Sequence, residues 1–272
     1  ITLGGIEITD SEAMDIVGGN LGDADATITV AGGAFAINGA FGGPVPSGAE
    51  LYYSFDNQVN PLSDDSVGAG HNGLPKNFYP AWTAGGVLNG AVTFDGAVSG
   101  VQPMDTAFLT DAINAVTVAM WIDQDVTTGT QILLDEGGAT NGFAIVLDEG
   151  ILKTKIKSGD NILELSSGTA LSDETHHIGV VFGNVSSKFE LYIDGALVDD
   201  GIYALTAVAA HGDLPGIGYL ENESPLTGGR FSGLMDELYY YDTGLSAEQI
   251  GELYAAPTIH GAVDMPKLAI NL

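Results

Sequence analysis

The chain has 272 residues and no cysteine, and it carries 7 Lys and Arg against 36 Asp and Glu, for a formal net charge of −29. So few basic side chains exclude nucleic acid and anionic membrane surfaces as partners, because both require clusters of Lys or Arg. Disulfides and thiolate chemistry are excluded as well, and no apolar run approaches the roughly 18 residues that predict membrane insertion. The acidity suits cation binding, a saline environment or solubility.

Residues 1–48 contain short apolar strand-like pieces of small residues, and 42–48 read as a linker. We predict an N-terminal strand-bearing extension and linker over 1–48 and a C-terminal extension over 257–272. Segments without a core are ordered only when tied down, so we expect both to pack on the central domain or to add a strand to a neighbouring subunit. The chain begins at Ile1 without a signal peptide, which fits a processed secreted protein or an excised part of a longer one.

Short β-rich runs recur between turn signals through the middle of the chain. They lie at 91–94, 116–122, 131–134, 143–147, 152–157, 162–165, 177–182, 189–193 and 234–241. Such close spacing predicts antiparallel pairing, and the pair Asp194 and Gly195 predicts a type I′ hairpin. His176 and His177, adjacent on one strand, must point to opposite faces. The prediction is an all-β, antiparallel, two-sheet sandwich over 49–256.

The run 231–254 (FSGLMDELYYYDTGLSAEQIGELY) combines a strand, a turn and a helix start. Strict alternation places Asp236 on the interior face with Leu238 and Tyr240, and turns Glu237 to the other face, where we expect it to be solvated or part of a polar row on the sheet. After the turn, Ser246 and Gln249 form a capping box that starts a short helix, and we expect Pro257 to end it.

This run resembles the C-terminal signature of the laminin-G-like, concanavalin A-like lectin/glucanase families. The runs 116–123 (VTVAMWID), 176–198 (HHIGVVFGNVSSKFELYIDGALV) and 51–96 (LYYSFDN through NGAVTFDG) resemble the central Trp-bearing strand, the paired hairpin and the opening of the same families. The resemblance covers roughly 49–256 and implies a jelly roll with one short C-terminal helix. Thr175 stands where these families commonly have Trp.

The resemblance also implies a structural Ca²⁺, held by Asp236, Asp56 and a backbone carbonyl near Gly96. Oxygen ligands of this kind suit a hard cation. The open alternative is that Asp236 caps turn amides, since a buried carboxylate needs either donors or a cation.

Four aromatic side chains are candidate ligand contacts. Tyr79 and Trp82 flank Pro80 in a loop, where they either stack on a sugar ring or close the end of the sandwich. Tyr239 and Tyr241 on the closing strand are further candidates.

Three loop positions complete the candidates. His71 lies beside Asp64, Asp65 and Asn72 in a polar grouping that suits a cation or ligand. Asn184 and Asn222 begin Asn-x-Ser sequons and are candidate glycosylation sites.

Catalysis is not expected. Glycoside hydrolysis needs two opposed carboxylates, and the Glu-x-Asp-x-Glu triplet of hydrolases with this architecture is missing from the sequence, as are a nucleophile elbow and a P-loop. The resemblance implies an extracellular or cell-surface recognition module for a carbohydrate or a surface protein. The alternative is a structural subunit of an extracellular filament or surface array, in which the terminal extensions join neighbouring subunits.

Overall fold

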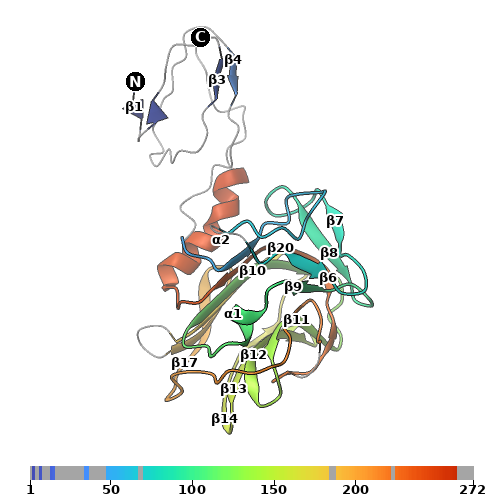
Figure 1. Cartoon of the computed structure of the whole chain (residues 1–272), viewed down its shortest axis with the longest axis vertical. Helices are drawn as coiled ribbons and strands as arrows, with labels where there is room; N and C mark the ends of the chain where they lie inside the picture. Colours follow the sequence, from blue (N-terminus) through green and yellow to red (C-terminus); the bar gives the residue numbers. More distant parts are fainter. Residues whose placement is uncertain are drawn as a thin grey trace. The chain divides into compact units, whose positions relative to one another are not determined.

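The computed structural model describes residues 47–66, 70–183, 188–221 and 224–256 in full, and elsewhere only the backbone of a few short elements. The chain divides into two compact units, one of Gly48–Gly251 and one of Ile1–Ser47 with Glu252–Leu272 (Figure 1). In the second unit, β1 (Thr2–Leu3) pairs antiparallel with β2 (Ile6–Glu7), and β3 (Ala13–Asp15) pairs parallel with β4 (Ala34–Ala36).

The Gly48–Gly251 unit contains two eight-stranded sheets that face each other (Figure 1). The first, here called the β10 sheet, has the order β17-β16-β15-β10-β20-β8-β7, with β5 also paired to β20. Its strands are β5 (Leu51–Tyr53), β7 (Ala81–Thr83), β8 (Ala91–Asp95), β10 (Val116–Gln124), β15 (His176–Phe182), β16 (Lys188–Ile193), β17 (Ala196–Ile202) and β20 (Ser232–Tyr241).

The second, here called the β11 sheet, has the order β14-β13-β12-β11-β18-β9-β6. Its strands are β6 (Gly73–Pro75), β9 (Val101–Pro103), β11 (Thr130–Gly137), β12 (Asn141–Asp148), β13 (Ile151–Ser158), β14 (Asn161–Ala170), β18 (Gly216–Ile217) and β19 (Gly229–Arg230). Pairing in both sheets is antiparallel except for the short parallel contact of β19 with β11. The all-β two-sheet prediction is confirmed.

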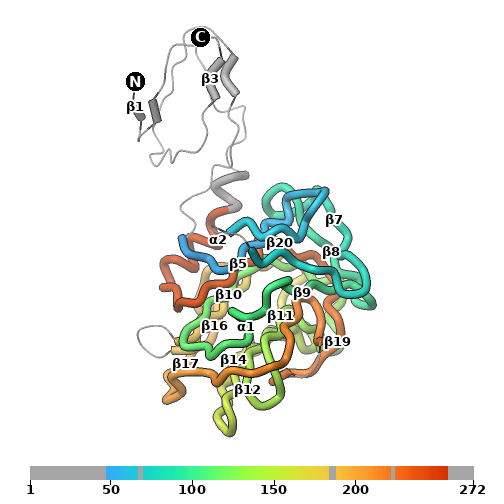
Figure 2. The backbone as a smooth tube through the Cα atoms, viewed as in Figure 1, coloured from blue at the N-terminus to red at the C-terminus, as the bar shows by residue number. Residues whose placement is uncertain are grey.

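Alternation along the strands builds the core. Met120 and Ile122 from β10 and Phe143, Ile145 and Leu147 from β12 all belong to one buried apolar cluster. Residues two apart share a sheet face, so the inner faces of the two sheets supply this cluster together. Figure 2 follows the chain as it passes back and forth between the two layers.

A bulge in β20 overturns the predicted facing of Asp236. Ala119 lies opposite Tyr239 but Trp121 lies opposite Asp236, so β20 has one more residue than β10 over this stretch. Glu237 takes φ 49°, as expected for the extra residue of a bulge. Met235, rather than Asp236, therefore shares the core face with Leu238 and Tyr240.

The predicted hairpin and capping box are confirmed. Asp194 and Gly195 have φ of 50° and 74° between β16 and β17, the positive values that a type I′ turn requires. The Ser246 amide donates to Gln249 Oε1 at 2.9 Å, and the Gln249 amide donates to Ser246 Oγ at 3.3 Å.

The helices of the described residues are α1 (Ala107–Thr110) and α2 (Ala247–Gly261). The prediction that Pro257 ends the last helix is wrong, since α2 continues to Gly261. Proline removes one amide donor, but its fixed φ is helical. Among the described residues, no helix is both long and apolar enough to cross a membrane.

Candidate functional site

A pocket of about 260 Å³ opens where β5, β20, α1 and the segment before β10 meet. It is lined by three acidic residues, one amide residue, two aromatic residues and three aliphatic residues, which are Glu50, Asp111, Asp242, Asn114, Phe108, Tyr240, Ala112, Ile113 and Ala115. It is slightly smaller than the roughly 300–1,000 Å³ typical of drug-sized ligand sites, so it suits a short ligand segment.

Hydrogen bonds of the fold hold the pocket walls. The Glu50 amide donates to the Tyr240 carbonyl at 2.9 Å, which places Glu50 directly before β5 and beside β20. The Ile113 amide donates to the Val208 carbonyl at 3.0 Å, and the Val208 amide returns a bond of 2.8 Å to Ile113. The segment between α1 and β10 is therefore fixed at its centre.

Of the two aromatic residues at the pocket, Phe108 is partly exposed and Tyr240 is buried. Phe108 from α1 meets Tyr240 edge to face, with ring centroids 5.4 Å apart at 78°. The Tyr240 hydroxyl donates to Glu136 Oε1 at 3.0 Å inside the sandwich, which anchors the ring from behind. Burial raises the pKa of Tyr240 well above its ordinary value, and negative charge on Glu136, Asp242 and Glu50 raises it further.

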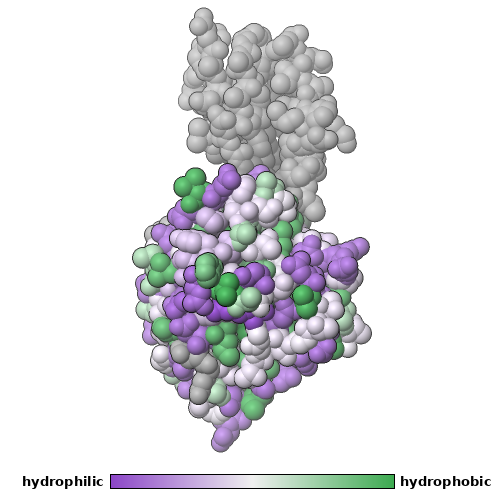
Figure 3. All heavy atoms as spheres, turned by 90° about the vertical axis from the view of Figure 1, so that its right-hand side faces the viewer, coloured by the Kyte–Doolittle hydropathy of each residue, from purple (hydrophilic) through white to green (hydrophobic). Residues whose placement is uncertain are grey.

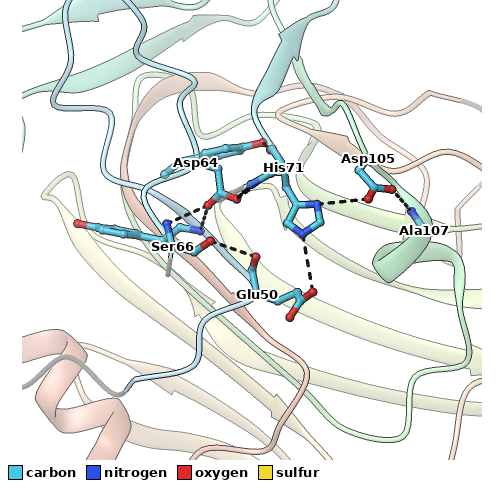
Figure 4. A network of polar contacts seen from close by, with 9 residues as sticks. Glu50, Asp64, Ser66, His71, Asp105 and Ala107 are labelled. Atoms are coloured by element: carbon cyan, nitrogen blue, oxygen red, sulfur yellow. Dashed lines mark hydrogen bonds and ion pairs between the residues drawn. The ribbon is translucent and has the colours of Figure 1, made fainter. Parts of the chain in front are cut away.

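His71 lies between the carboxylates of Glu50 and Asp105 (Figure 4). Its Nε2 lies 3.7 Å from Glu50 Oε1 and its Nδ1 lies 3.8 Å from Asp105 Oδ2, while its ring lies against Phe108 with centroids 4.3 Å apart. His71 thus bridges a carboxylate and an aromatic ring of the pocket.

Asp64, the predicted neighbour of His71, does not line the pocket. It accepts backbone amides of Ser66, Gly70 and His71 and so fixes the loop that carries the imidazole. Burial alone would raise its pKa, but these hydrogen bonds outweigh burial and lower it.

The three positions of the predicted calcium site do not come together. Asp236 and Asp56 both hold the loop that precedes β8: Asp236 Oδ2 accepts the amides of Val87 and Leu88 at 2.7 and 3.2 Å, and Asp56 Oδ1 accepts the amide of Gly90 at 2.9 Å. Gly96 lies elsewhere, since its neighbour Asp95 pairs with Ser232, four positions or about 13 Å along the strand from Asp236.

The donors around Asp236 do not fit the implied cation. Its Oδ1 accepts the Glu237 amide at 2.9 Å, so both carboxylate oxygens already accept backbone donors, and the side chain is fully buried. Within the described residues, no group of three or more acidic or histidine side chains could hold a metal ion. This arrangement favours the alternative in which Asp236 caps amides.

Glu237 is buried, not solvated as the alternation suggested. The bulge turns its carboxylate toward Tyr52 and Tyr239, whose hydroxyls donate to Oε2 at 2.8 and 2.9 Å. Burial raises its pKa to about 8, and the charge of Asp236 adds to the effect.

The four predicted aromatic contacts differ in exposure. Tyr79 is 61% exposed, whereas Tyr239 and Tyr241 are buried at 5% and 0% and present no surface to a ligand. Trp82 is half-buried, and its indole N–H donates to the Phe55 carbonyl at 2.9 Å. None of the four lines the pocket.

Of the two adjacent histidines, His177 is buried beside the Trp121 ring, and His176 Nδ1 lies 2.8 Å from Asp194 Oδ2, so they do point to opposite faces. Asn184 and Asn222 lie outside the described residues.

Sequence reasoning missed the pocket residues. Glu50, Phe108 and Tyr240 are separated by more than 50 positions at each step, and no spacing motif joins them. The tyrosine run of the closing strand is the one related signal in the sequence. It predicted Tyr239 and Tyr241 as ligand contacts, whereas Tyr240 is the member that lies at the pocket.

Comparison with known proteins agrees with this fold. The family model described as the concanavalin A-like lectin/glucanases superfamily matches residues 95–251, more than half of the chain. A search of curated proteins found no significant match.

Solved structures with the same fold share little sequence. Domain 4 of AbnA, a GH43 extracellular arabinanase from Geobacillus stearothermophilus solved with arabinotriose, is 19% identical with a TM-score of 0.60, covering 76% of this chain and 98% of that one. The binding domain of Paraclostridial mosquitocidal protein 1 is 15% identical with a TM-score of 0.60, covering 76% of this chain and 52% of that one. The binding domain of botulinum neurotoxin serotype G is 12% identical with a TM-score of 0.58, covering 76% and 50%.

This chain therefore spans about half the length of the toxin domains that it matches. The match of the family model over the sandwich, together with the two facing antiparallel sheets, shows that the chain belongs to the concanavalin A-like lectin/glucanases superfamily.

Proposed function

We propose that the chain is a non-catalytic carbohydrate-binding module of an extracellular or cell-surface protein, and that the pocket at Phe108 and Tyr240 holds a short sugar segment. The observation that carries the proposal is the set of residues that line the pocket, in which the partly exposed Phe108 lies beside the acidic residues Glu50, Asp111 and Asp242 and the amide residue Asn114. Sugars present apolar C–H faces and hydroxyl donors, and such a wall offers a partner to each.

Two further findings support the proposal. The AbnA domain, which has the same fold, was solved with a bound arabinose trimer. The sequence of this chain lacks the carboxylate triplet of hydrolases with this architecture, so recognition without cleavage is the simpler function for this site.

A glycan array followed by calorimetry tests the proposal. Phe108→Ala should weaken binding of the selected glycan at least tenfold, which corresponds to about 1.4 kcal/mol, because it removes the ring that faces Tyr240. Phe78→Ala is the matched control, since Phe78 is a 62% exposed phenylalanine that does not line the pocket. A blank array would refute sugar binding, and equal loss in both variants would refute this site.

A second candidate function, assembly by strand addition, is favoured by β17. This strand ends the β10 sheet and exposes Leu197, Val198 and Ile202 at 48%, 44% and 75%, and an unpaired edge is a template for a further strand. Light scattering over a hundredfold range of protein concentration tests it. A constant monomer mass would exclude assembly and leave sugar binding intact.

A further inference from the structure

We propose that His71 is a positioning residue of the pocket, whose protonated ring draws Glu50 and Asp105 together beside Phe108 and so tightens sugar binding at mildly acidic pH. This inference rests on the proposed function and names the regulation of the same site. Glu50 and Phe108 line the pocket, so His71 acts through these two residues and need not touch the sugar.

The His71 ring faces a carboxylate with each of its nitrogens (Figure 4). Nε2 lies 3.7 Å from Glu50 Oε1, and Nδ1 lies 3.8 Å from Asp105 Oδ2. Both distances exceed the roughly 2.7–3.2 Å of a hydrogen bond, and Nδ1 is buried with no hydrogen-bond partner among the described residues. A neutral imidazole has one N–H donor and an imidazolium has two. Only the charged ring can therefore donate to both carboxylates.

The two carboxylates belong to different parts of the pocket. Glu50 lies directly before β5. Asp105 lies before α1, where its Oδ1 accepts the Ala107 amide at 3.0 Å and so holds the start of the helix that carries Phe108. The Phe108 ring packs on the imidazole with centroids 4.3 Å apart. A ring that pairs with both carboxylates therefore ties α1 to the segment before β5.

The backbone of His71 is fixed, whereas its two partners are free to approach. Asp64 accepts the His71 amide at 3.0 Å, and the Tyr53 hydroxyl donates to the His71 carbonyl. The side chains of Glu50 and Asp105 are 43% and 58% exposed, against 17% for His71. Among the described residues, the ring forms ion pairs with these two carboxylates and no others, since Asp64 binds the backbone.

The expected direction follows from the charges. Histidine changes charge within the physiological pH range, while exposed carboxylates stay ionised above about pH 5. Protonation of His71 thus converts two loose contacts into charge-assisted ones and orders Glu50 and Phe108 before the sugar arrives, which lowers the entropic cost of binding. Glu50 still has lone pairs for a sugar hydroxyl. Because the protonated form binds more tightly, sugar binding must take up protons.

Calorimetry on the full chain tests the inference with the glycan that the array selects. We expect binding to be about twofold to fivefold tighter at about pH 5.5 than at about pH 8, the size that partly exposed ion pairs supply. Binding heats measured between these values, in buffers of different ionisation enthalpy, should show net proton uptake.

Two variants probe the ring and one of its partners. His71→Gln cannot become charged and should lose both the pH dependence and the proton uptake. Asp105→Asn, at an exposed side chain, keeps an oxygen for the Ala107 amide and should weaken both, which guards against poor folding of the first variant. His176→Gln is the control, because it removes a histidine that pairs with Asp194 and does not line the pocket.

An affinity that is independent of pH in the parent chain would overturn the inference while sugar binding stands. An undiminished pH dependence in His71→Gln would also overturn it, and would assign the effect to the buried carboxyls Asp135, Asp236 and Glu237, whose pKa values of about 7 to 8 lie in the same range. If the glycan array is blank at both pH values, the inference fails together with the proposed function.

Discussion

Several buried carboxyl groups have pKa values well above those of ordinary Asp and Glu side chains. Burial raises the pKa of Glu237 to about 8, of Asp135 to about 8 and of Asp236 to about 7. A carboxyl whose pKa is higher in the folded chain than in the unfolded chain binds more protons when folded. Its contribution to the free energy of unfolding therefore falls as pH rises from the unfolded value through the folded one.

We predict that the free energy of unfolding falls between about pH 6.5 and 8, by up to about 1.4 kcal/mol per pH unit for each carboxyl that ionises. His177, whose pKa burial lowers from 6.5 to about 4, acts in the opposite direction. Its effect is nearly complete by about pH 7.5, where the unfolded imidazole is almost wholly neutral. Urea unfolding at several pH values measures the slope.

Glu237→Gln should make that slope shallower, because it removes one ionising group and keeps an oxygen for the tyrosine hydroxyls. Glu248→Gln, at an exposed position of α2, should not change it. A free energy of unfolding that rises over this pH range would contradict the raised pKa values of these carboxyls.

Asp236 gives a second prediction at the same scale. Asp236→Ala leaves the amides of Val87 and Leu88 without their acceptor, and we expect a loss of about 2–4 kcal/mol in the free energy of unfolding. Asp173→Ala at an exposed loop position should cost little. Chemical denaturation measures both, and equal stability of the two variants would show that the loop does not depend on this carboxylate.

Chelation separates the two interpretations of Asp236. Because its oxygens already accept three backbone amides, we expect EDTA to leave the midpoint of thermal unfolding unchanged. A fall of several degrees that Ca²⁺ reverses, and Mg²⁺ does not, would establish the calcium site implied by the family resemblance.

At the scale of elements, the start of α2 is set by local chemistry. Ser246 and Gln249 exchange hydrogen bonds through their side chains and backbone amides, and loss of the Ser hydroxyl removes one acceptor for a helix amide. We expect Ser246→Ala to lower the free energy of unfolding by about 1 kcal/mol. Ser246→Thr keeps the hydroxyl and is the control, so equal melting of Ser246→Ala, Ser246→Thr and the parent chain would contradict the role of the cap.

The bulge in β20 is an element that alternation cannot predict. A bulge adds one residue to one strand of a pair, and every side chain beyond it changes face relative to a regular strand. The secondary-structure propensities of Asp236 and Glu237 do not predict the bulge. Tight packing of Leu238 and Tyr240 against the opposite sheet and the hydrogen bonds of Glu237 to two tyrosines compensate for its positive φ.

At the scale of the whole molecule, the net charge of −29 opposes the compact state through self-repulsion. We predict that the midpoint of thermal unfolding rises by several degrees between about 10 mM and 1 M NaCl, because salt screens this repulsion. Differential scanning calorimetry measures the shift. Sucrose at equal osmolarity lacks the screening and is the control for general solute effects, and a midpoint that falls with NaCl would contradict the prediction.

The sequence by itself determined the features that depend on neighbours in the chain. The alternating apolar runs predicted the strands, Asp194 with Gly195 predicted the hairpin, and Ser246 with Gln249 predicted the helix start, because each of these rests on contacts a few residues apart. The family resemblance rests on the same local runs and is confirmed by the family model over 95–251.

Only the tertiary structure decided which side chains share a site. Glu50, Phe108 and Tyr240 meet because β5 pairs with β20 and α1 packs beside them, and Gly96 is kept from Asp236 by the register of β8 on β20. Strand register and bulges depend on the packing of one whole sheet on the other, a property that no short stretch of sequence contains.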